Sequence, residues 1–297
     1  MPITIHPLPN PAPWGANKAA KLASYWPEIE ATGARTLVVP GGAYSNLLWA
    51  LAAIGQEHGL TTVGLVRGDE LKGLTMAQTP GLARLQALGM QIELLDRPTY
   101  RSVCKQGPAT TIPQLWDSLD RPYFIPEGAS GPLALVGLIA EAKTWVGDLN
   151  PEVQLVVPVG TGATMAGIAI ARYEAWVSLG QGTLPPPTLG FAPFRDQAYC
   201  TSLVLDQISN YFTDRGIADP MALAIQLAKV IAVPDLGRYG RPSQAVLASV
   251  ANHKASTGQQ LNPIYSGFCL AALEASFERA ELDPRVHYVL VDTGGAA

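Results

Sequence analysis

The segment VQLVVPVGTGATMAG, residues 153–167, passes from an apolar run through a glycine-rich turn into a helical pattern with no spacer. Its Val and Leu residues are typical of a strand that is buried on both faces, as in a parallel sheet. The residues that follow predict a helix over 164–177. A strand that leads through a tight turn into a helix is the repeating unit of α/β folds, so this segment predicts that fold class.

Short apolar runs and longer helical segments continue to alternate on both sides of this segment. Such an alternation is typical of a mostly parallel sheet that is covered by helices. Strands are predicted at residues 36–40, 61–68, 91–96, 122–128, 187–193, 229–234 and 287–295, and helices at residues 45–58, 81–89, 132–145 and 244–255.

The length and composition of the chain predict a large core. Of its 297 residues, 48% are hydrophobic and 15% are charged. A chain of this length predicts either two domains or one large α/β domain. A polar turn at residues 146–152 separates two blocks of strands and helices and marks a candidate boundary, whereas the proline-rich stretch 180–187 is interpreted as a surface loop.

Several classes of protein are disfavoured by the same composition. The net charge is -4, and no stretch interleaves basic and aromatic residues as nucleic-acid binders do, so we expect no nucleic-acid partner. Residues 1–15 are broken by prolines and lack the basic start and apolar centre of a secretory signal. The apolar runs are far shorter than the roughly 20 residues that a membrane helix needs. We therefore expect a cytoplasmic protein without a membrane span.

Cysteine and histidine are sparse. Cys104, Cys200 and Cys269 are odd in number and far apart, which argues against a disulfide framework and against a zinc cage. The four histidines include no pair at i, i+4 spacing, so we expect no metal site.

The glycine turn at residues 160–164 is the strongest local signal for ligand binding. Backbone N–H groups at a helix N-terminus converge on one point and bind phosphate without a basic side chain. A plain tight turn between a strand and a helix is the alternative. A Walker A loop is excluded because no Gly-Lys-Ser/Thr follows, and a dinucleotide site fits poorly because the glycine spacing differs and no acidic residue ends a strand about 20 residues later.

A second candidate is VVPGGAYSN, residues 38–46, where Ser45 and Asn46 open a helix behind a glycine pair. Either residue alone is first of all a helix N-cap. Together, behind two glycines, they are also suited to binding a carboxylate and a ring oxygen.

Three further features are weaker when each is taken alone. Tyr239 and Tyr265 lie among turn residues, where a tyrosine more often packs and ties its hydroxyl to backbone. The stretch DTGG, residues 292–295, follows a predicted strand at its carboxyl end, where open α/β sheets bind ligands. Lys18, in PWGANKAAKLASYW, has small neighbours that leave space beside its amine, although a solvated lysine is the alternative.

The order of these motifs along the chain resembles one family. Asn-Lys, Gly-Gly-x-x-Ser-Asn, Thr-Gly-x-Thr-x-Ala-Gly, Gly-x-x-Tyr-Gly, Pro-x-Tyr-x-Gly and Thr-Gly-Gly follow one another as in the pyridoxal-phosphate enzymes of the aminocyclopropane-carboxylate deaminase and D-cysteine desulfhydrase family. The resemblance extends from about residue 14 to residue 295. It implies an α/β fold of the tryptophan synthase β type, fold type II, with two three-layer αβα domains.

The resemblance also implies the domain boundaries and the oligomer. The larger domain comprises residues 1–34 and 149–297, and the smaller domain comprises residues 35–148. The cofactor, pyridoxal 5′-phosphate, is expected in the cleft between the domains, and a homodimer is the usual arrangement.

Cofactor attachment is assigned by the same resemblance. Lys18 matches the lysine that bonds covalently to the cofactor, and Asn46 matches the residue that hydrogen-bonds the phenolic oxygen of its ring. Gly160, Thr161, Gly162, Ala163 and Thr164 match the phosphate cup. The physical interpretation agrees, because a buried lysine becomes the neutral amine that an aldehyde requires.

The remaining site residues follow in the same way. Ser45 matches the residue that binds the substrate carboxylate, and Tyr265 and Tyr239 match active-site tyrosines. Ser266 falls where the partner of the pyridine nitrogen sits, and Thr293 precedes the terminal Gly-Gly, as in the desulfhydrase branch. A hydroxyl holds the proton of the ring nitrogen less firmly than the acidic residue of the deaminase branch, so we expect elimination of a β-substituent.

The chain departs from the family pattern in three places. Leu47 and Trp49 replace polar residues after Ser45-Asn46, Ala20 replaces an arginine, and Pro-rich sequence runs directly into Lys18 where relatives carry a further strand. We expect a lyase or deaminase of a small amino acid, most simply a D-cysteine desulfhydrase that forms pyruvate, ammonia and sulfide. Deamination of 1-aminocyclopropane-1-carboxylate, and a non-catalytic protein that keeps the ligand site, are the alternatives.

Overall fold

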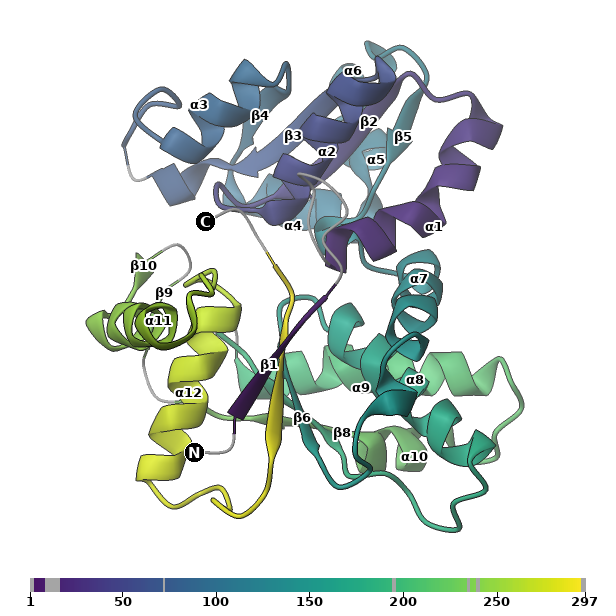
Figure 1. The fold of residues 1–297 in the computed structure, drawn as a ribbon. Coiled ribbons are helices and arrows are strands. Elements are labelled where there is room, and N and C mark those ends of the chain that lie inside the picture. The colour runs from purple at the N-terminus through teal and green to yellow at the C-terminus, as the bar shows by residue number, and fades with distance from the viewer. Residues whose placement is uncertain are drawn as a thin grey trace. The chain divides into compact units, whose positions relative to one another are not determined.

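The computed structural model describes residues 3–8, 17–71, 73–193, 196–233, 236–238 and 241–294 (Figure 1). The chain folds into two compact units, a larger unit of residues 1–10 and 131–297 and a smaller unit of residues 11–130. Each unit is built on its own parallel sheet, and the predicted α/β class is confirmed.

The sheet of the larger unit has five described strands in the order β1-β11-β6-β7-β8, and each neighbouring pair is parallel. Their bounds are β1 Ile3–Pro7, β6 Gln154–Pro158, β7 Thr188–Phe191, β8 Ala228–Ile231 and β11 Tyr288–Asp292. A short antiparallel pair, β9 Gly237–Arg238 and β10 Arg241–Pro242, lies outside this sheet.

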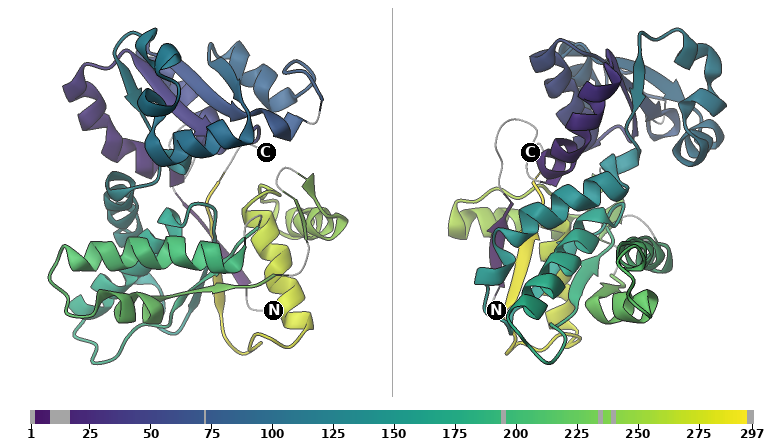
Figure 2. Two further views of the ribbon diagram at one scale, coloured as in Figure 1. Left: turned by 180° about the vertical axis from the view of Figure 1, so that it is seen from behind. Right: turned by 90° about the vertical axis from the view of Figure 1, so that its right-hand side faces the viewer.

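Helices cover both faces of this sheet. They are α7 Pro132–Lys143, α8 Ala163–Ser178, α9 Gln197–Thr213, α10 Pro220–Leu227, α11 Gln244–Thr257 and α12 Ser266–Glu278, with the short 3-10 helix η3 Val146–Asp148. Both α8 and α12 contact β6. They do so from opposite faces of the sheet, α8 together with α7 on one side and α12 together with α11 on the other (Figure 2).

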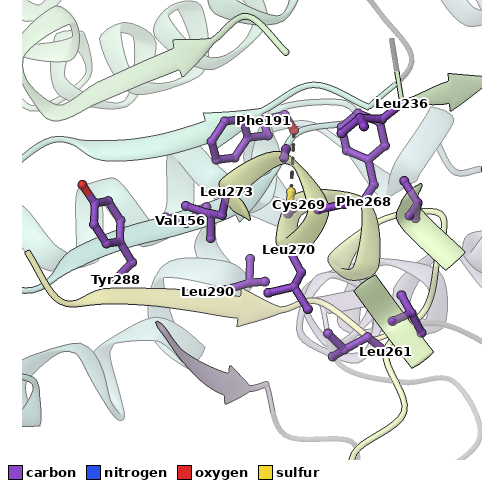
Figure 3. Close-up of a cluster of buried hydrophobic side chains, with 14 of the residues drawn as sticks. Val156, Phe191, Leu236, Leu261, Phe268, Cys269, Leu270, Leu273, Tyr288 and Leu290 are labelled. Atoms are coloured by element: carbon purple, nitrogen blue, oxygen red, sulfur yellow. Dashed lines mark hydrogen bonds between the residues drawn. The ribbon is translucent and has the colours of Figure 1, made fainter. Parts of the chain in front are cut away.

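The core between α12 and the sheet fixes the start of α12. Figure 3 shows Leu270 and Leu273 of α12 beside Val156 of β6 and Leu290 of β11, all almost fully buried. Burial of one such side chain stabilises the fold by about 1.5–3 kcal/mol. Because α12 is held along its length, the residues at its first turn are held in place as well.

The first strand, β1, was not predicted. Its residues pair with β11 from Ile3 opposite Tyr288 to Pro7 opposite Asp292. The prolines around it argue against a strand in the sheet interior, but β1 lies at the edge of the sheet, where a proline at the end of a strand removes no ladder bond. The expectation that Pro-rich sequence reaches Lys18 without a preceding strand is therefore wrong.

The sheet of the smaller unit has four described strands in the order β4-β3-β2-β5, again all parallel. They are β2 Thr36–Gly41, β3 Thr61–Arg67, β4 Gln91–Leu95 and β5 Pro122–Phe124. Its helices are α1 Asn17–Thr32, α2 Asn46–His58, α3 Pro80–Ala87, α4 Arg97–Gln106, α5 Pro108–Thr111 and α6 Pro113–Asp117, with the 3-10 helices η1 Gly68–Leu71 and η2 Glu127–Ala129.

The two faces of β3 carry different helices. Val63 and Leu65 form a buried cluster with Val103 of α4. A side chain at Gly64 would lie on the opposite face of the sheet, where it would meet Leu48 of α2. Because successive residues of a strand face opposite sides, this alternation gives the unit its helix–sheet–helix layering.

The observed division of the chain differs from the predicted one, which placed the smaller domain at residues 35–148. Helix α1 packs against α2 and η2 in the smaller unit, and α7 packs against α8 in the larger unit. The physical reason is that a helix joins the unit whose surface its apolar face covers, whereas the sequence marked the boundary only by polar turns.

Candidate functional site

The turn between β6 and α8 has the backbone of an anion-binding loop. Gly162 occupies the N-cap of α8 in the left-handed region, with φ 83° and ψ −27°. A Cβ at this position would lie 2.9 Å from Nε2 of Gln207 and 3.2 Å from the backbone of Leu203, so only glycine fits. Because Gly162 has no side chain, it leaves the N–H groups of the first turn of α8 to other acceptors.

Gln207 of α9 holds this turn in place through hydrogen bonds to the backbone. Its Nε2 donates to the carbonyl of Thr161 over 3.0 Å and to the carbonyl of Leu203 over 2.7 Å, which ties the turn to α9. Gly160 is different, because no heavy atom lies within 4 Å of a Cβ built there. The turn is thus anchored at Thr161 and Gly162 and has open space at Gly160.

Ser266 and Thr293 meet at the end of β11, the strand next to β6. Ser266 is fully buried at the first position of α12, and its Oγ donates to Oδ1 of Asp292 over 2.6 Å. The backbone N–H of Thr293 donates to Oγ of Ser266 over 3.2 Å, and that of Gly294 donates to Oδ1 of Asp292 over 3.1 Å. Asp292 was not among the predicted site residues, although its place at the head of the DTGG stretch was a signal.

Tyr265 lies beside Ser266 at the N-cap of α12 and is half-buried. The loop before it is fixed, since the carbonyl of Asn262 accepts from the N–H of Gly267 over 2.8 Å and Oδ1 of Asn262 accepts from the N–H of Ile264, also over 2.8 Å. This loop therefore places Tyr265 at the same end of the sheet as Ser266. The other predicted tyrosine, Tyr239, lies outside the described residues.

Ser45 caps helix α2 in the smaller unit. Its Oγ accepts from the N–H of Leu47 over 3.3 Å, which bears out the capping interpretation. A Cβ at Gly41 would lie 2.9 Å from Leu48 and 3.0 Å from Oγ of Ser45, so the glycine lets the strand end and the cap approach closely. The Ser45 hydroxyl keeps its own proton for a further acceptor.

Lys18 lies in the first turn of α1, one helical turn before Lys21. Lys18 is half-buried, and burial lowers the pKa of its amine to about 8 from an ordinary 10.5, while a hydrogen bond with Lys21 opposes this shift. Lys21 is 1% exposed, and its Nζ donates to the carbonyl of Gly128 over 2.8 Å. Burial first, and then the nearby charge of Lys18, hold the pKa of Lys21 well below its ordinary value.

The predicted site residues thus fall into two groups. In the larger unit the 160–164 turn, Tyr265, Ser266 and Thr293 gather at the carboxyl ends of the neighbouring strands β6 and β11. In the smaller unit Ser45 and Asn46 follow β2, and Lys21, one turn from Lys18, bonds to the segment after the neighbouring strand β5. In an open parallel sheet this is the edge where ligands bind.

The departures at residues 47 and 49 have a structural explanation. Leu47 is fully buried in the smaller unit. The ring of Trp49 carries the guanidinium of Arg84 at 3.9 Å from its centroid, a cation–π contact between α2 and α3. The positive charge near this turn of α2 is thus supplied by Arg84 of α3.

Two negative findings apply to the part of the chain that the structure describes. It contains no group of three or more His, Cys, Asp or Glu side chains that could hold a metal ion. None of its helices is long and apolar enough to cross a membrane.

The comparisons with known proteins identify relatives along almost the whole chain. No family model matches. A D-cysteine desulfhydrase of Klebsiella pneumoniae is 26% identical over 294 residues, which cover 96% of this chain and 84% of that protein. The chain is a homologue of the D-cysteine desulfhydrases. A Pyrococcus horikoshii protein whose name provisionally assigns it as a 1-aminocyclopropane-1-carboxylate deaminase is 20% identical over 287 residues, covering 95% of this chain and 80% of that protein.

Solved structures agree with this relationship to the desulfhydrases at the level of the fold. The structure of an ACC deaminase homologue matches with a TM-score of 0.68 at 21% identity, over 95% of this chain and 80% of that one. A hydrogen sulfide-producing enzyme from Fusobacterium nucleatum matches with a TM-score of 0.60 at 14% identity, over 99% of this chain and 88% of that one. The fold is that of the type II pyridoxal-phosphate enzymes, which confirms the predicted fold and the resemblance drawn from the motifs.

Proposed function

We propose that this protein is a pyridoxal-phosphate-dependent lyase that eliminates sulfide from D-cysteine, giving pyruvate and ammonia. The relationship to D-cysteine desulfhydrases over 96% of the chain supports the class of reaction. The observation that carries the proposal to this chain's own residues is the place of Lys18 in the first turn of α1, hydrogen-bonded to the buried Lys21, where burial lowers the pKa of its amine to about 8.

The residues present fit the cofactor. Gly162, in the left-handed region, has no side chain that could cap α8, and the space beside Gly160 is open, as a phosphate group requires. The cofactor, when bound, supplies the electron sink that stabilises negative charge at the α-carbon of an amino acid. The protein supplies binding, orientation and proton transfer.

Lys18 supplies the amine. An aldehyde reacts with a neutral amine, and a pKa near 8 leaves a useful neutral fraction at physiological pH. Once released by an incoming amino acid, Nζ of Lys18 acts as the general base that removes the proton from the substrate α-carbon.

Ser45 and Asn46 orient the reacting groups. The Ser45 hydroxyl accepts from Leu47 and still has a proton to donate, so it can bind the substrate carboxylate. Asn46 is half-buried at the first position of α2 and is assigned to the ring oxygen of the cofactor. Tyr265, held at the start of α12, and Tyr239 are assigned to proton transfer at the leaving group.

A second candidate substrate is 1-aminocyclopropane-1-carboxylate. The name of the Pyrococcus relative favours it, as does the structural match, with a TM-score of 0.68, to an ACC deaminase homologue. This substrate has no α-proton, so a tyrosine would have to act at the ring. Release of 2-oxobutyrate from it, measured beside release of pyruvate and sulfide from D- and L-cysteine, separates the two substrates.

Cofactor attachment is tested with the purified protein and added pyridoxal phosphate. We expect a visible absorption band of lysine-bound cofactor in the wild type and in Lys105→Ala, which changes an exposed lysine of α4, and no such band in Lys18→Ala. A band that persists in Lys18→Ala overturns the assignment. Bound cofactor without turnover of any D- or L-amino acid would instead identify a non-catalytic binding protein.

The assembly and location are further parts of the proposal. Family members are usually homodimers, and we propose the same for this chain, located in the cytoplasm. Light scattering of the purified protein and fractionation of cells that produce it test these two points.

A further inference from the structure

We propose that Lys21 is an uncharged amine that accepts a hydrogen bond from Lys18, so that the two amines hold one proton between them and Lys21 positions Nζ of Lys18. The importance of this lysine pair for catalysis rests on the proposed function, whereas the pair itself is defined by contacts of α1 and η2. Lys21 was not among the predicted site residues.

Lys21 lies where a positive charge is costly. Its side chain is 1% exposed, and its Nζ donates to the carbonyl of Gly128 over 2.8 Å. An ammonium has three protons to donate, and burial of a charged group is expensive unless an opposite charge and enough hydrogen-bond partners accompany it. Both lysines also lie in the first turn of α1, where the positive end of the helix dipole disfavours a second positive charge. These conditions favour a neutral amine at Lys21.

The acidic side chains near the lysine pair have other partners. Helix α1 packs against α2 and η2. The carboxylate of Glu127 in η2 accepts from the hydroxyl of Tyr100 over 2.9 Å, and that of Glu30 in α1 accepts from Nε1 of Trp26 over 3.0 Å. The other titratable side chains of these three elements, apart from the pair, are Tyr25, Glu28, Glu57 and His58. Within the described residues, none of these groups forms a hydrogen bond or an ion pair with Lys21.

The proton of the pair belongs on Lys18. Lys18 is half-buried, so water solvates a charge there better than at Lys21. The two amines share a hydrogen bond, and burial lowers the pKa of Lys18 to about 8 while it holds that of Lys21 well below its ordinary value. Below about pH 8 the ammonium of Lys18 therefore donates to the lone pair of Lys21, which in turn donates to the carbonyl of Gly128.

This order of donors and acceptors holds Lys18 in both of its protonation states. When Lys18 is charged, it donates to Lys21. When Lys18 has lost its proton, each amine has both a proton to donate and a lone pair, so the hydrogen bond persists. Lys21 thus positions Nζ of Lys18 at the pH where that amine becomes a nucleophile.

The charge state of Lys21 determines the sign of a mutational effect. An acceptor stabilises the protonated form of Lys18, so its removal in Lys21→Met should lower the pKa of Lys18 further. A positively charged Lys21 would give the opposite result, because removal of a like charge raises the pKa of a neighbouring ammonium. The direction of the shift therefore separates the two states.

The inference is tested by NMR of the cofactor-free, full-length protein with ¹³C- and ¹⁵N-labelled lysines, whose side-chain resonances are assigned through the backbone. The chemical shifts of Cε and Nζ report the protonation of each amine and require neither cofactor nor turnover. In the wild type at pH 7 we expect a neutral Lys21 and a protonated Lys18, whose midpoint lies near pH 8. In Lys21→Met the midpoint of Lys18 should fall by roughly one pH unit.

Lys105→Met is the matched control, because Lys105 is an exposed lysine of α4 in the same unit. It should leave the titrations of Lys18 and Lys21 unchanged. A charged Lys21 or an uncharged Lys18 in the wild type at pH 7 overturns the inference without any variant, as does a Lys18 midpoint that rises or stays the same in Lys21→Met. Absence of covalent cofactor attachment at Lys18 would instead overturn the proposed function and leave the lysine pair as inferred.

Discussion

The amine of Lys21 donates a hydrogen bond to the carbonyl of Gly128 over 2.8 Å, which joins the start of α1 to the segment after β5. Gly128 is in the left-handed region, with φ 71°, and Ala129 follows with φ 46°. A buried lysine that bonds to a carbonyl in so unusual a turn holds the first helix, and with it Lys18, to the sheet of the smaller unit.

Replacement of Lys21 should destabilise the protein in a graded way. Lys21→Ala removes a fully buried stem and leaves the Gly128 carbonyl without its donor, so we expect the free energy of unfolding to fall by about 2–4 kcal/mol. Lys21→Met keeps most of the stem and should lose at least about 1 kcal/mol less. Urea unfolding with Lys105→Ala as control measures this, and equal losses for Ala and Met would contradict it.

The reactivity of Lys18 should titrate at lower pH than that of an ordinary lysine. With a pKa of about 8, its amine becomes neutral about two units below an exposed lysine. The initial rate of covalent cofactor attachment, trapped with borohydride and mapped by mass spectrometry, should therefore rise with a midpoint near pH 8 at Lys18, well below the midpoint of a lysine in a short model peptide. Coinciding midpoints for Lys18 and the model peptide would argue against an amine whose pKa is lowered by burial.

The same shift affects stability. Between the folded pKa of about 8 and the unfolded value of 10.5, the unfolded state binds more protons at Lys18 than the folded state does. The free energy of unfolding therefore gains a contribution as pH rises through this window, and below pH 8 the cost of charging Lys18 is present in full. The free energy of unfolding of Lys18→Met, relative to that of the wild type, should therefore be higher at pH 7 than at pH 10.5. Urea unfolding of both proteins at both pH values measures this difference.

Gly162→Ala should impair cofactor binding. A Cβ at this left-handed position would press on Gln207 and on the backbone of Leu203. Gly180 is a control at the other end of α8, with φ 68° and no heavy atom within 4 Å of an added Cβ. We expect Gly180→Ala to cost roughly 1 kcal/mol of stability and to leave cofactor affinity unchanged, while Gly162→Ala lowers that affinity at least about tenfold. Fluorescence titration with pyridoxal phosphate measures both, and equal affinities would exclude the turn as the phosphate site.

Ser45→Ala should affect both stability and substrate binding. Loss of the N-cap costs about 1 kcal/mol. Ser243 caps α11 with the same 3.3 Å bond, from the N–H of Val246, so Ser243→Ala is the matched control for stability alone. We expect similar losses on unfolding but a raised KM for the amino acid only in Ser45→Ala. An unchanged KM in Ser45→Ala would show that Ser45 caps α2 but does not bind the substrate.

Most of the described strands, and the helices α2, α3, α7, α8 and α11, were predicted from the sequence, because a buried parallel strand such as β2 or β6 is a short apolar run that glycine or proline ends. Strand β1 was not found by this reasoning, since its neighbour in the described sheet, β11, lies far away in the sequence. The helices that were also not predicted include α4, α5, α6, α9, α10 and α12. The apolar residues of α12 continue around the helix without a clear polar face, so it lacks the period on which such a prediction depends.

The candidate site shows the same limit. The 160–164 turn and Ser45 are local features, and their backbone geometry follows from glycine and from capping. The hydrogen bonds of Asp292 and Lys21 join partners that are 26 and 107 positions apart in the sequence, so no local motif predicts these contacts. Contacts of that kind become visible only when the fold brings the partners together.

The pairing of β1 with β11 has a consequence for synthesis on the ribosome. Residues 3–7 leave the ribosome before the other described strands, whereas their described partner in the sheet, the strand at residues 288–292, leaves it after all of them. The smaller unit, residues 11–130, is contained in one continuous stretch and can complete its sheet long before then. Strand β1 can therefore complete its described pairing only after every other described strand has been made.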